Sequence, residues 1–214
     1  MTMTLHPDYG ARARLDAETR APLSAYAKTA LAASFGIALG LAATYIVTAR
    51  EFPFGAARSG SWTAWPRTGA IDADPYARAI VARKADVPLG NGEGIVFIAH
   101  TDADDRPLDG RCDYSLDGAM PAARLWTLAA YTPSGRIADV NDGHRELTSA
   151  NVLRSSGGDA RIVAAPFARA GNWLAVPHAR PFALALTLYD AAASPTLTSL
   201  EGLPLPTIRR GVCS

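Results

Sequence analysis

Aspartate is the residue with the densest local cluster in this sequence, with four copies between positions 102 and 109: Asp102, Asp104, Asp105 and Asp109. Carboxylate oxygens are the ligands that calcium prefers, but an EF-hand loop also needs Gly at its sixth position and Glu at its twelfth. Counted from Asp102, those positions hold Pro107 and Asp113. Proline cannot make the glycine turn, and the Asp113 side chain is one carbon too short. We therefore expect a polar hairpin loop and predict no metal site.

Histidine and serine give no local catalytic pattern either. The histidines of the C-terminal region are His100, His144 and His178, and no two are two or four residues apart, as paired ligands on one strand or helix would be. The sequence has no G-x-S-x-G motif, and Ser134 and Ser149 lie in loop-like contexts. We predict no cofactor. Paired carboxylates for glycoside cleavage would meet only in the folded chain, so an enzyme stays open.

Cys112 and Cys213 are the two cysteines of the chain. In an exported domain a cysteine pair is expected to be disulfide-bonded, whereas two unrelated thiols would fit a cytoplasmic domain. A bond closing a loop of about 100 residues would stabilise the fold by up to about 4.7 kcal/mol in the chain-entropy model. We predict this disulfide, which would also hold the C-terminal tail.

Residues 29–49 form a run without a charged side chain between Lys28 and Arg50. At 1.5 Å per residue its helical length is about 32 Å, which matches a hydrocarbon core of about 30 Å. We predict a single transmembrane helix that anchors the chain in the lipid bilayer of the inner (cytoplasmic) membrane. Gly36 and Gly40 form a G-x-x-x-G pattern, which allows close helix approach and indicates a possible homodimer.

Charges flanking this helix favour an orientation. Four basic residues precede it and three follow: Arg12, Arg14, Arg20 and Lys28, then Arg50, Arg58 and Arg67. The positive-inside rule therefore weakly places residues 1–28 in the cytoplasm and the C-terminal domain in the periplasm. A cleaved signal peptide ending at Val47-Thr48-Ala49 is the alternative, although its apolar region would be longer than usual. Both interpretations export the domain.

The rest of the chain predicts a linker and one domain. Residues 50–69 are rich in Gly, Ser, Arg and Pro. Their Trp62 and Trp65 would either rest on the membrane surface or pack on the domain, and we favour packing on the domain. Residues 70–214 would form that domain. With 49% hydrophobic residues, 19% charged residues and a net charge of +1, the chain carries no basic stripe, so we predict no nucleic-acid partner.

The domain is predicted to be mainly β with one short helix. Asp74 is a good N-cap and Pro75 suits the first helical position, so a helix begins here and ends before Pro88. Strands are predicted at 95–99, 112–116, 124–132, 151–154, 161–165, 173–176 and 182–189; the last alternates large and small side chains. Seven short strands separated by turns are typical of a β-sandwich or a jelly roll.

Several short motifs follow one another in this region: Asp74-Pro75-Tyr76-Ala77-Arg78-Ala79, Leu108-Asp109-Gly110, Cys112-Asp113-Tyr114, Ala123-Arg124-Leu125-Trp126-Thr127-Leu128 and Gly171-Asn172-Trp173-Leu174. Together they resemble the domain of unknown function 1214 over roughly residues 70–212. The resemblance implies a jelly-roll-like β-sandwich and export to the periplasm. It also implies the short, membrane-anchored form, which lacks the 1254 domain that precedes this one in longer relatives. It supplies no agreed reaction.

The polar and aromatic members of these motifs are the candidate ligand-binding residues: Asp113, Tyr114, Arg124, Trp126, Asn172, Trp173 and Tyr189. An arginine with tryptophan and tyrosine on one sheet face would make a platform for a sugar or an acid. In the structural alternative, which we favour, Arg124 pairs with Asp113 near strand ends and the aromatic rings fill the interior.

Two function classes follow. The favoured hypothesis is a membrane-anchored, periplasm-facing module that binds an envelope ligand or partner. The alternative is a hydrolase-like enzyme acting on a saccharide or another small envelope substrate. That enzyme would need carboxylates or histidines converging in a pocket with shifted pKa values. A purely structural scaffold would show neither a binding face nor such a cluster.

Overall fold

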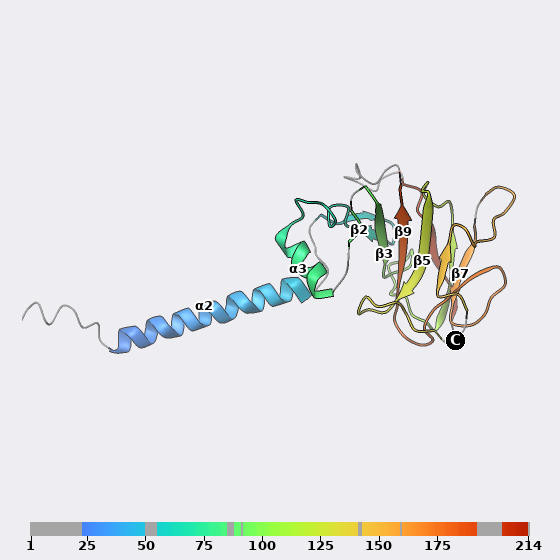
Figure 1. Cartoon of the computed structure of the whole chain (residues 1–214). Coiled ribbons are helices and arrows are strands. Elements are labelled where there is room, and N and C mark those ends of the chain that lie inside the picture. The colour runs from blue at the N-terminus through green and yellow to red at the C-terminus, as the bar shows by residue number, and fades with distance from the viewer. Residues whose placement is uncertain are drawn as a thin grey trace, which may run out of the picture. The chain divides into compact units, whose positions relative to one another are not determined.

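The computed structural model describes residues 23–49, 55–84, 88–90, 92–140, 143–158, 160–191 and 203–213, in two compact units, 1–50 and 51–214 (Figure 1). Most of the predicted cytoplasmic segment 1–28 lies outside the described residues.

The first unit contains one long apolar helix, α2 (Leu23–Ala49). Its stretch Ser24–Val47 has a mean hydropathy of 1.9, and no side chain in that stretch is buried. The hydroxyls of Thr29 and Thr44 donate to backbone carbonyls of the preceding turn, so these polar groups are satisfied within the helix. By length and composition α2 can cross a membrane, as a retained anchor or as a signal sequence.

The second unit is mainly β and contains two sheets. The first has the order β1 (Ala57–Ser59), β2 (Trp62–Ala64), β3 (Gly94–Ala99), β9 (Ala183–Tyr189), β5 (Leu125–Tyr131) and β6 (Glu146–Thr148), with every neighbouring pair antiparallel. The second has the order β10 (Thr207–Cys213), β4 (Cys112–Asp117), β7 (Ile162–Ala165) and β8 (Asn172–Ala175). There β7 and β8 run parallel. The mainly β prediction is confirmed, and the jelly-roll topology stays a prediction.

One hydrophobic core lies between the sheets. Strand β9 shows the predicted alternation, with Leu184, Leu186 and Leu188 all almost fully buried. From the second sheet Leu116 and Ile162 join the same cluster with no exposed surface. The two sheets therefore bury their facing sides against each other, which is the arrangement of a β-sandwich.

The predicted helix is confirmed as α3 (Pro75–Lys84). The Asp74 carboxylate accepts the backbone N–H of Tyr76 at 2.8 Å, as an N-cap does. Ala77 and Ile80, one turn apart, are buried on its inner face. Local sequence was sufficient here because the cap and the apolar face both lie within one short segment.

The structure differs from the strand predictions in four places. The expected linker 50–69 contributes β1 and β2, and Trp62 packs in the core with its indole N–H donating to the carbonyl of Pro206 at 2.7 Å. Residues 151–154 form no strand, whereas β6 and β10 were missed. Strands β1, β2 and β6 have only three residues each, which is too short to show an alternating pattern. Their pairing depends on distant partners.

Candidate functional site beside the disulfide

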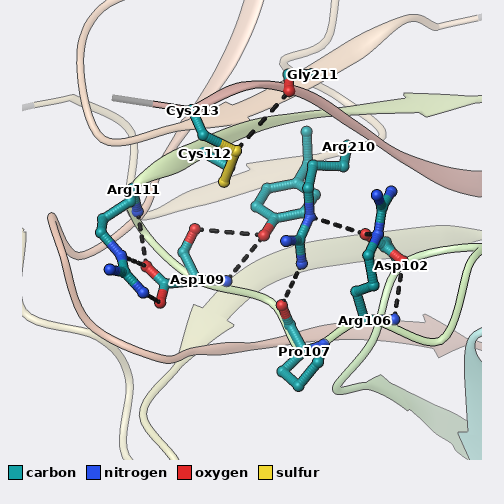
Figure 2. Close-up of a disulfide and its surroundings, with 10 residues drawn as sticks. Asp102, Arg106, Pro107, Asp109, Arg111, Cys112, Arg210, Gly211 and Cys213 are labelled. Atoms are coloured by element: carbon teal, nitrogen blue, oxygen red, sulfur yellow. Dashed lines mark hydrogen bonds and ion pairs between the residues drawn. A yellow bond between two sulfur atoms is a disulfide. The ribbon is translucent and has the colours of Figure 1, made fainter.

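A cleft of about 530 Å³ opens where strand β4 begins and strand β10 ends. We call it the disulfide cleft; it is lined by Pro107, Leu108, Asp109, Arg111, Cys112, Pro181, Arg210 and Cys213. Figure 2 shows its charged side chains around the cysteine pair. Prolines, a leucine and the disulfide give it a mostly apolar lining with three charged groups, the usual composition of a ligand pocket.

Cys112 and Cys213 form the predicted disulfide, so that expectation is confirmed. The two residues are register partners of the antiparallel β4–β10 pair, and their Cα atoms lie 3.9 Å apart. Cys112 is buried, whereas Cys213 is exposed. The bond joins positions 101 residues apart and fixes the end of an edge strand. It therefore holds one wall of the cleft in place.

The Asp102 carboxylate is 1% exposed and lies at the charged centre below the disulfide. One oxygen accepts the backbone N–H groups of Asp104 and Arg106, each at 3.0 Å. The other oxygen faces Nε of Arg106 at 3.0 Å and Nε of Arg210 at 2.9 Å. Burial raises the pKa of Asp102, but these hydrogen bonds and charges outweigh it, so its pKa is below the usual value. The acidic loop is thus ordered by arginines.

Arg210 connects this carboxylate with the cleft (Figure 2). Its guanidinium carbon lies 5.5 Å from the ring centre of Tyr114, and Nη2 donates to the carbonyl of Pro107. Its Nε is close to Asp102 but is buried without a hydrogen-bond partner in line with its N–H. The side chain keeps only 20% of its surface exposed. Arg210 is therefore held in place by the Pro107 carbonyl, by the charge of Asp102 and by the aromatic ring of Tyr114.

Tyr114 forms the floor beneath Arg210 and is fully buried. Its hydroxyl accepts the backbone N–H of Asp109 at 2.9 Å and donates to the carbonyl of the same residue at 3.3 Å. Its ring meets Phe182 edge-on, with centroids 5.7 Å apart. Burial raises the pKa of Tyr114, so the phenol stays neutral at physiological pH. The phenol thus fixes the backbone at the cleft wall.

Arg111 and Asp109 form a two-pronged ion pair at the rim. Nε of Arg111 lies 3.1 Å from Oδ1 of Asp109, and Nη2 lies 2.8 Å from Oδ2. The Arg111 hydrogen bonds hold the pKa of Asp109 below its usual value. Both carboxylates here are therefore ionised and paired at neutral pH, so neither is prepared to donate a proton. Within the described part of the chain, no three His, Cys, Asp or Glu residues are placed to hold a metal ion.

Two of the seven predicted candidates lie on strand β4 next to the cleft, and they face opposite ways. Tyr114 points inward as described, and Asp113 pairs with Arg169 at 2.8 Å. Arg124 pairs instead with Asp190 at 3.2 Å, with 78% of its side chain exposed. The expected Arg124–Asp113 pair is therefore wrong. The reason is tertiary: Asp113 belongs to the second sheet, and Arg124 adjoins β5 in the first.

The other four candidates lie on three different strands. Trp126 is in the core at 2% exposure, and Tyr189 is half-buried on β9. The amide of Asn172 accepts the N–H of Leu153 at 2.6 Å and donates to the carbonyls of Leu153 and Arg161. The Trp173 indole donates to a backbone carbonyl of β7 at 2.9 Å. These contacts give most of the set structural roles, while its part in binding stays a prediction.

Sequence reasoning missed Arg111, Arg210 and Pro181 as residues of one site. A weak signal existed, since Arg111 directly precedes the first cysteine and Arg210 lies three residues before the second. Once the disulfide is expected, its flanking charges are brought together as well. Pro181 lies just before β9 and forms an isolated β-bridge with Asp109. No local pattern in the sequence indicates this pairing.

Two mainly antiparallel sheets that share one core define a β-sandwich domain. A disulfide joins β4 and β10 within the second sheet. Residues 93–193 match the profile of a family described as "Protein of unknown function (DUF1214)". The match confirms the resemblance to this family over residues 93–193. None of the curated proteins is similar enough to count as a match.

Two solved structures are similar to this chain. The VPA0106 protein from Vibrio parahaemolyticus is 22% identical with a TM-score of 0.53, and the match covers 66% of this chain and 36% of that one. An uncharacterized protein from Burkholderia cenocepacia is 17% identical with a TM-score of 0.41, over 61% of this chain and 33% of that one. This chain therefore spans about a third of the length of either. At such identity the likeness to VPA0106 shows the fold alone.

Proposed function

We propose that this chain is a membrane-anchored module, exported to the periplasm, that binds an envelope ligand or partner without catalysing a reaction. The observation that carries the proposal is the disulfide between Cys112 and Cys213. Disulfides form and persist in oxidising compartments such as the periplasm and are rare in the cytosol. A domain closed by such a bond fits the outer side of the inner membrane.

Helix α2 supports the anchor. Residues 29–49 carry no charged side chain, and a soluble helix with no buried side chain would show a polar face. Its backbone groups are paired within the helix, as a lipid environment requires. The weak excess of basic residues before position 29 favours a cytoplasmic N-terminus.

The disulfide cleft supports binding over hydrolysis. Its apolar lining suits the apolar part of a small ligand, and its two arginines are placed to orient a polar group of that ligand. General acid–base catalysis needs a group whose pKa lies near the working pH. The pKa values of Asp102 and Asp109 are lowered by their arginine partners, which moves both carboxylates away from that range.

A thiol-blocking experiment on membrane fractions tests the proposal. Maleimide should shift the mass of the protein only after reductant, and protease added to spheroplasts should digest the domain from outside. The Cys112→Ser/Cys213→Ser double variant is the control, because it should never shift. Free thiols together with a protected domain would place the domain in the cytoplasm and overturn the proposal.

Ligand screening then follows from the site. Envelope components that bind the full chain should lose affinity when Pro181, a wall of the cleft, is changed to Arg. The matched control is Pro166→Arg, outside the cleft lining and in the loop between β7 and β8. Equal loss from both variants would show that binding occurs elsewhere. Turnover of a bound saccharide would instead favour the hydrolase-like alternative.

A further inference from the structure

A second surface of the β domain exposes apolar side chains around the start of α3. Ile71 is 97% exposed in the turn before this helix, and Tyr76 is 50% exposed in its first turn. The turn is well anchored, because the carbonyl of Ile71 accepts from the guanidinium of Arg78 and Asp74 caps the helix. Ile71 and Tyr76 are thus two exposed apolar side chains on a backbone that is held in place, and exposed apolar patches mark protein or membrane interaction sites.

The same segment is basic. Residues 55–84 contain five basic and two acidic side chains, a net charge of +3, whereas the whole chain carries +1: Arg58, Arg67, Arg78, Arg83 and Lys84 against Asp72 and Asp74. Asp74 is engaged in the helix cap. Asp72 pairs with Arg67, but their side chains are 70% and 73% exposed, so water and ions weaken this pair. An anion can therefore compete for Arg67.

The position of the surface along the chain points to a bilayer. A cleft of about 420 Å³ is lined by Gly55 together with Arg67, Asp72, Asp74 and other residues of this segment. Gly55 is thus close to the turn that carries Ile71. The six Cα steps from Ala49, the last residue of α2, to Gly55 span at most about 22 Å. A membrane that holds the helix therefore keeps this surface within reach of its headgroups.

We propose that Arg67, Ile71 and Tyr76 form a membrane-contacting surface that binds anionic lipid headgroups. Ile71 and Tyr76 would enter the headgroup region, and Arg67 would meet lipid phosphates. This inference rests on the proposed membrane anchoring. It adds that the domain lies on the bilayer instead of moving freely on its tether, with the surface around Ile71 turned toward the lipid.

The test uses the full chain in lipid nanodiscs. The native cysteines are bonded, so a maleimide fluorophore without reductant labels only an introduced cysteine. Ile71→Cys reports on the surface. The matched control is Ile137→Cys. Ile137 is 55% exposed and forms an isolated β-bridge with Tyr131. Tyr131 and Gly94 lie at opposite ends of the first sheet. Headgroup-labelled quencher lipids are mixed with either anionic phosphatidylglycerol or zwitterionic phosphatidylcholine.

We expect a blue shift and quenching at position 71 in anionic discs. Both should be lost in phosphatidylcholine and reduced at 1 M salt, where charges are screened beyond about 3 Å. Arg67→Glu should also reduce them, and position 137 should show none of these effects. Equal signals at 71 and 137 in anionic discs would overturn the inference while leaving the anchor intact. Failure of the full chain to remain in discs would overturn the anchor and, with it, this inference.

Discussion

Replacement of Asp102 by Asn tests the reasoning about the charged centre beneath the cleft. The carboxylate is 1% exposed and faces two guanidinium groups, at 3.0 Å from Arg106 and 2.9 Å from Arg210. The amide oxygen of Asn can still accept the two backbone N–H groups, so the change removes chiefly the charge. Removing one member of a buried ion pair costs about 3–5 kcal/mol, because the remaining charge is left without compensation.

The expected loss lies near the lower end of that range. Arg210 keeps 20% of its side chain exposed and Arg106 keeps 48%, so water compensates part of each charge. We therefore expect Asp102→Asn to lower the free energy of unfolding by about 3 kcal/mol. Urea denaturation of the full chain in detergent, followed by tryptophan fluorescence, measures this quantity. Asp104→Asn is the control, since its carboxylate is 72% exposed and should contribute at most about 1 kcal/mol.

The pH dependence gives an independent check. The pKa of Asp102 is lower in the folded state than its usual 3.8. The unfolded chain therefore binds this proton first as pH falls, and the carboxylate stabilises the fold above pH 3.8. That contribution is lost as the pH falls through the folded pKa, and Asp102→Asn should flatten the acid limb. A loss below about 1 kcal/mol with an unchanged acid limb would refute the assignment of a buried, charge-bearing centre.

Other changes test the remaining contacts. Cys112→Ser/Cys213→Ser should lower the free energy of unfolding by up to about 4.7 kcal/mol, measured by urea denaturation, and reductant should have no further effect on the variant. Gly110→Ala would place a Cβ 1.7 Å from the carbonyl oxygen of Pro177, so we expect a loss of at least about 2 kcal/mol by thermal denaturation. Gly36→Leu should abolish the predicted homodimer, measured by energy transfer between labelled chains in liposomes.

For each of these three variants, one result would contradict the expected effect. A disulfide variant as stable as the parent would mean that β10 is held by its strand pairing alone. Gly157→Ala is the control for Gly110, because its nearest neighbour would lie 3.7 Å away; equal losses would show that the close approach is unimportant. Energy transfer that persists in the Gly36 variant would place any dimer contact elsewhere.

Local patterns were sufficient where one segment carries its own reason to fold. The Asp74 cap and the apolar face of α3 lie within one short stretch. Strand β9 alternates because every second side chain enters the core. The apolar run of α2 needs no partner to be recognised, since its length alone matches a bilayer. Strands of three residues contain no full alternation, so β1, β2 and β6 could not be found in this way.

The sequence by itself therefore determined the apolar helix, the mainly β domain, its family resemblance and the partnership of the two cysteines. Only the tertiary structure decided which charges meet. Asp113 joins Arg169 and not Arg124, because Asp113 and Arg124 belong to different sheets. Asp102 becomes a buried centre because Arg210 arrives from more than 100 residues away on the last strand. Periodicity is a property of one strand, whereas an ion pair depends on the register between strands, which the whole core sets.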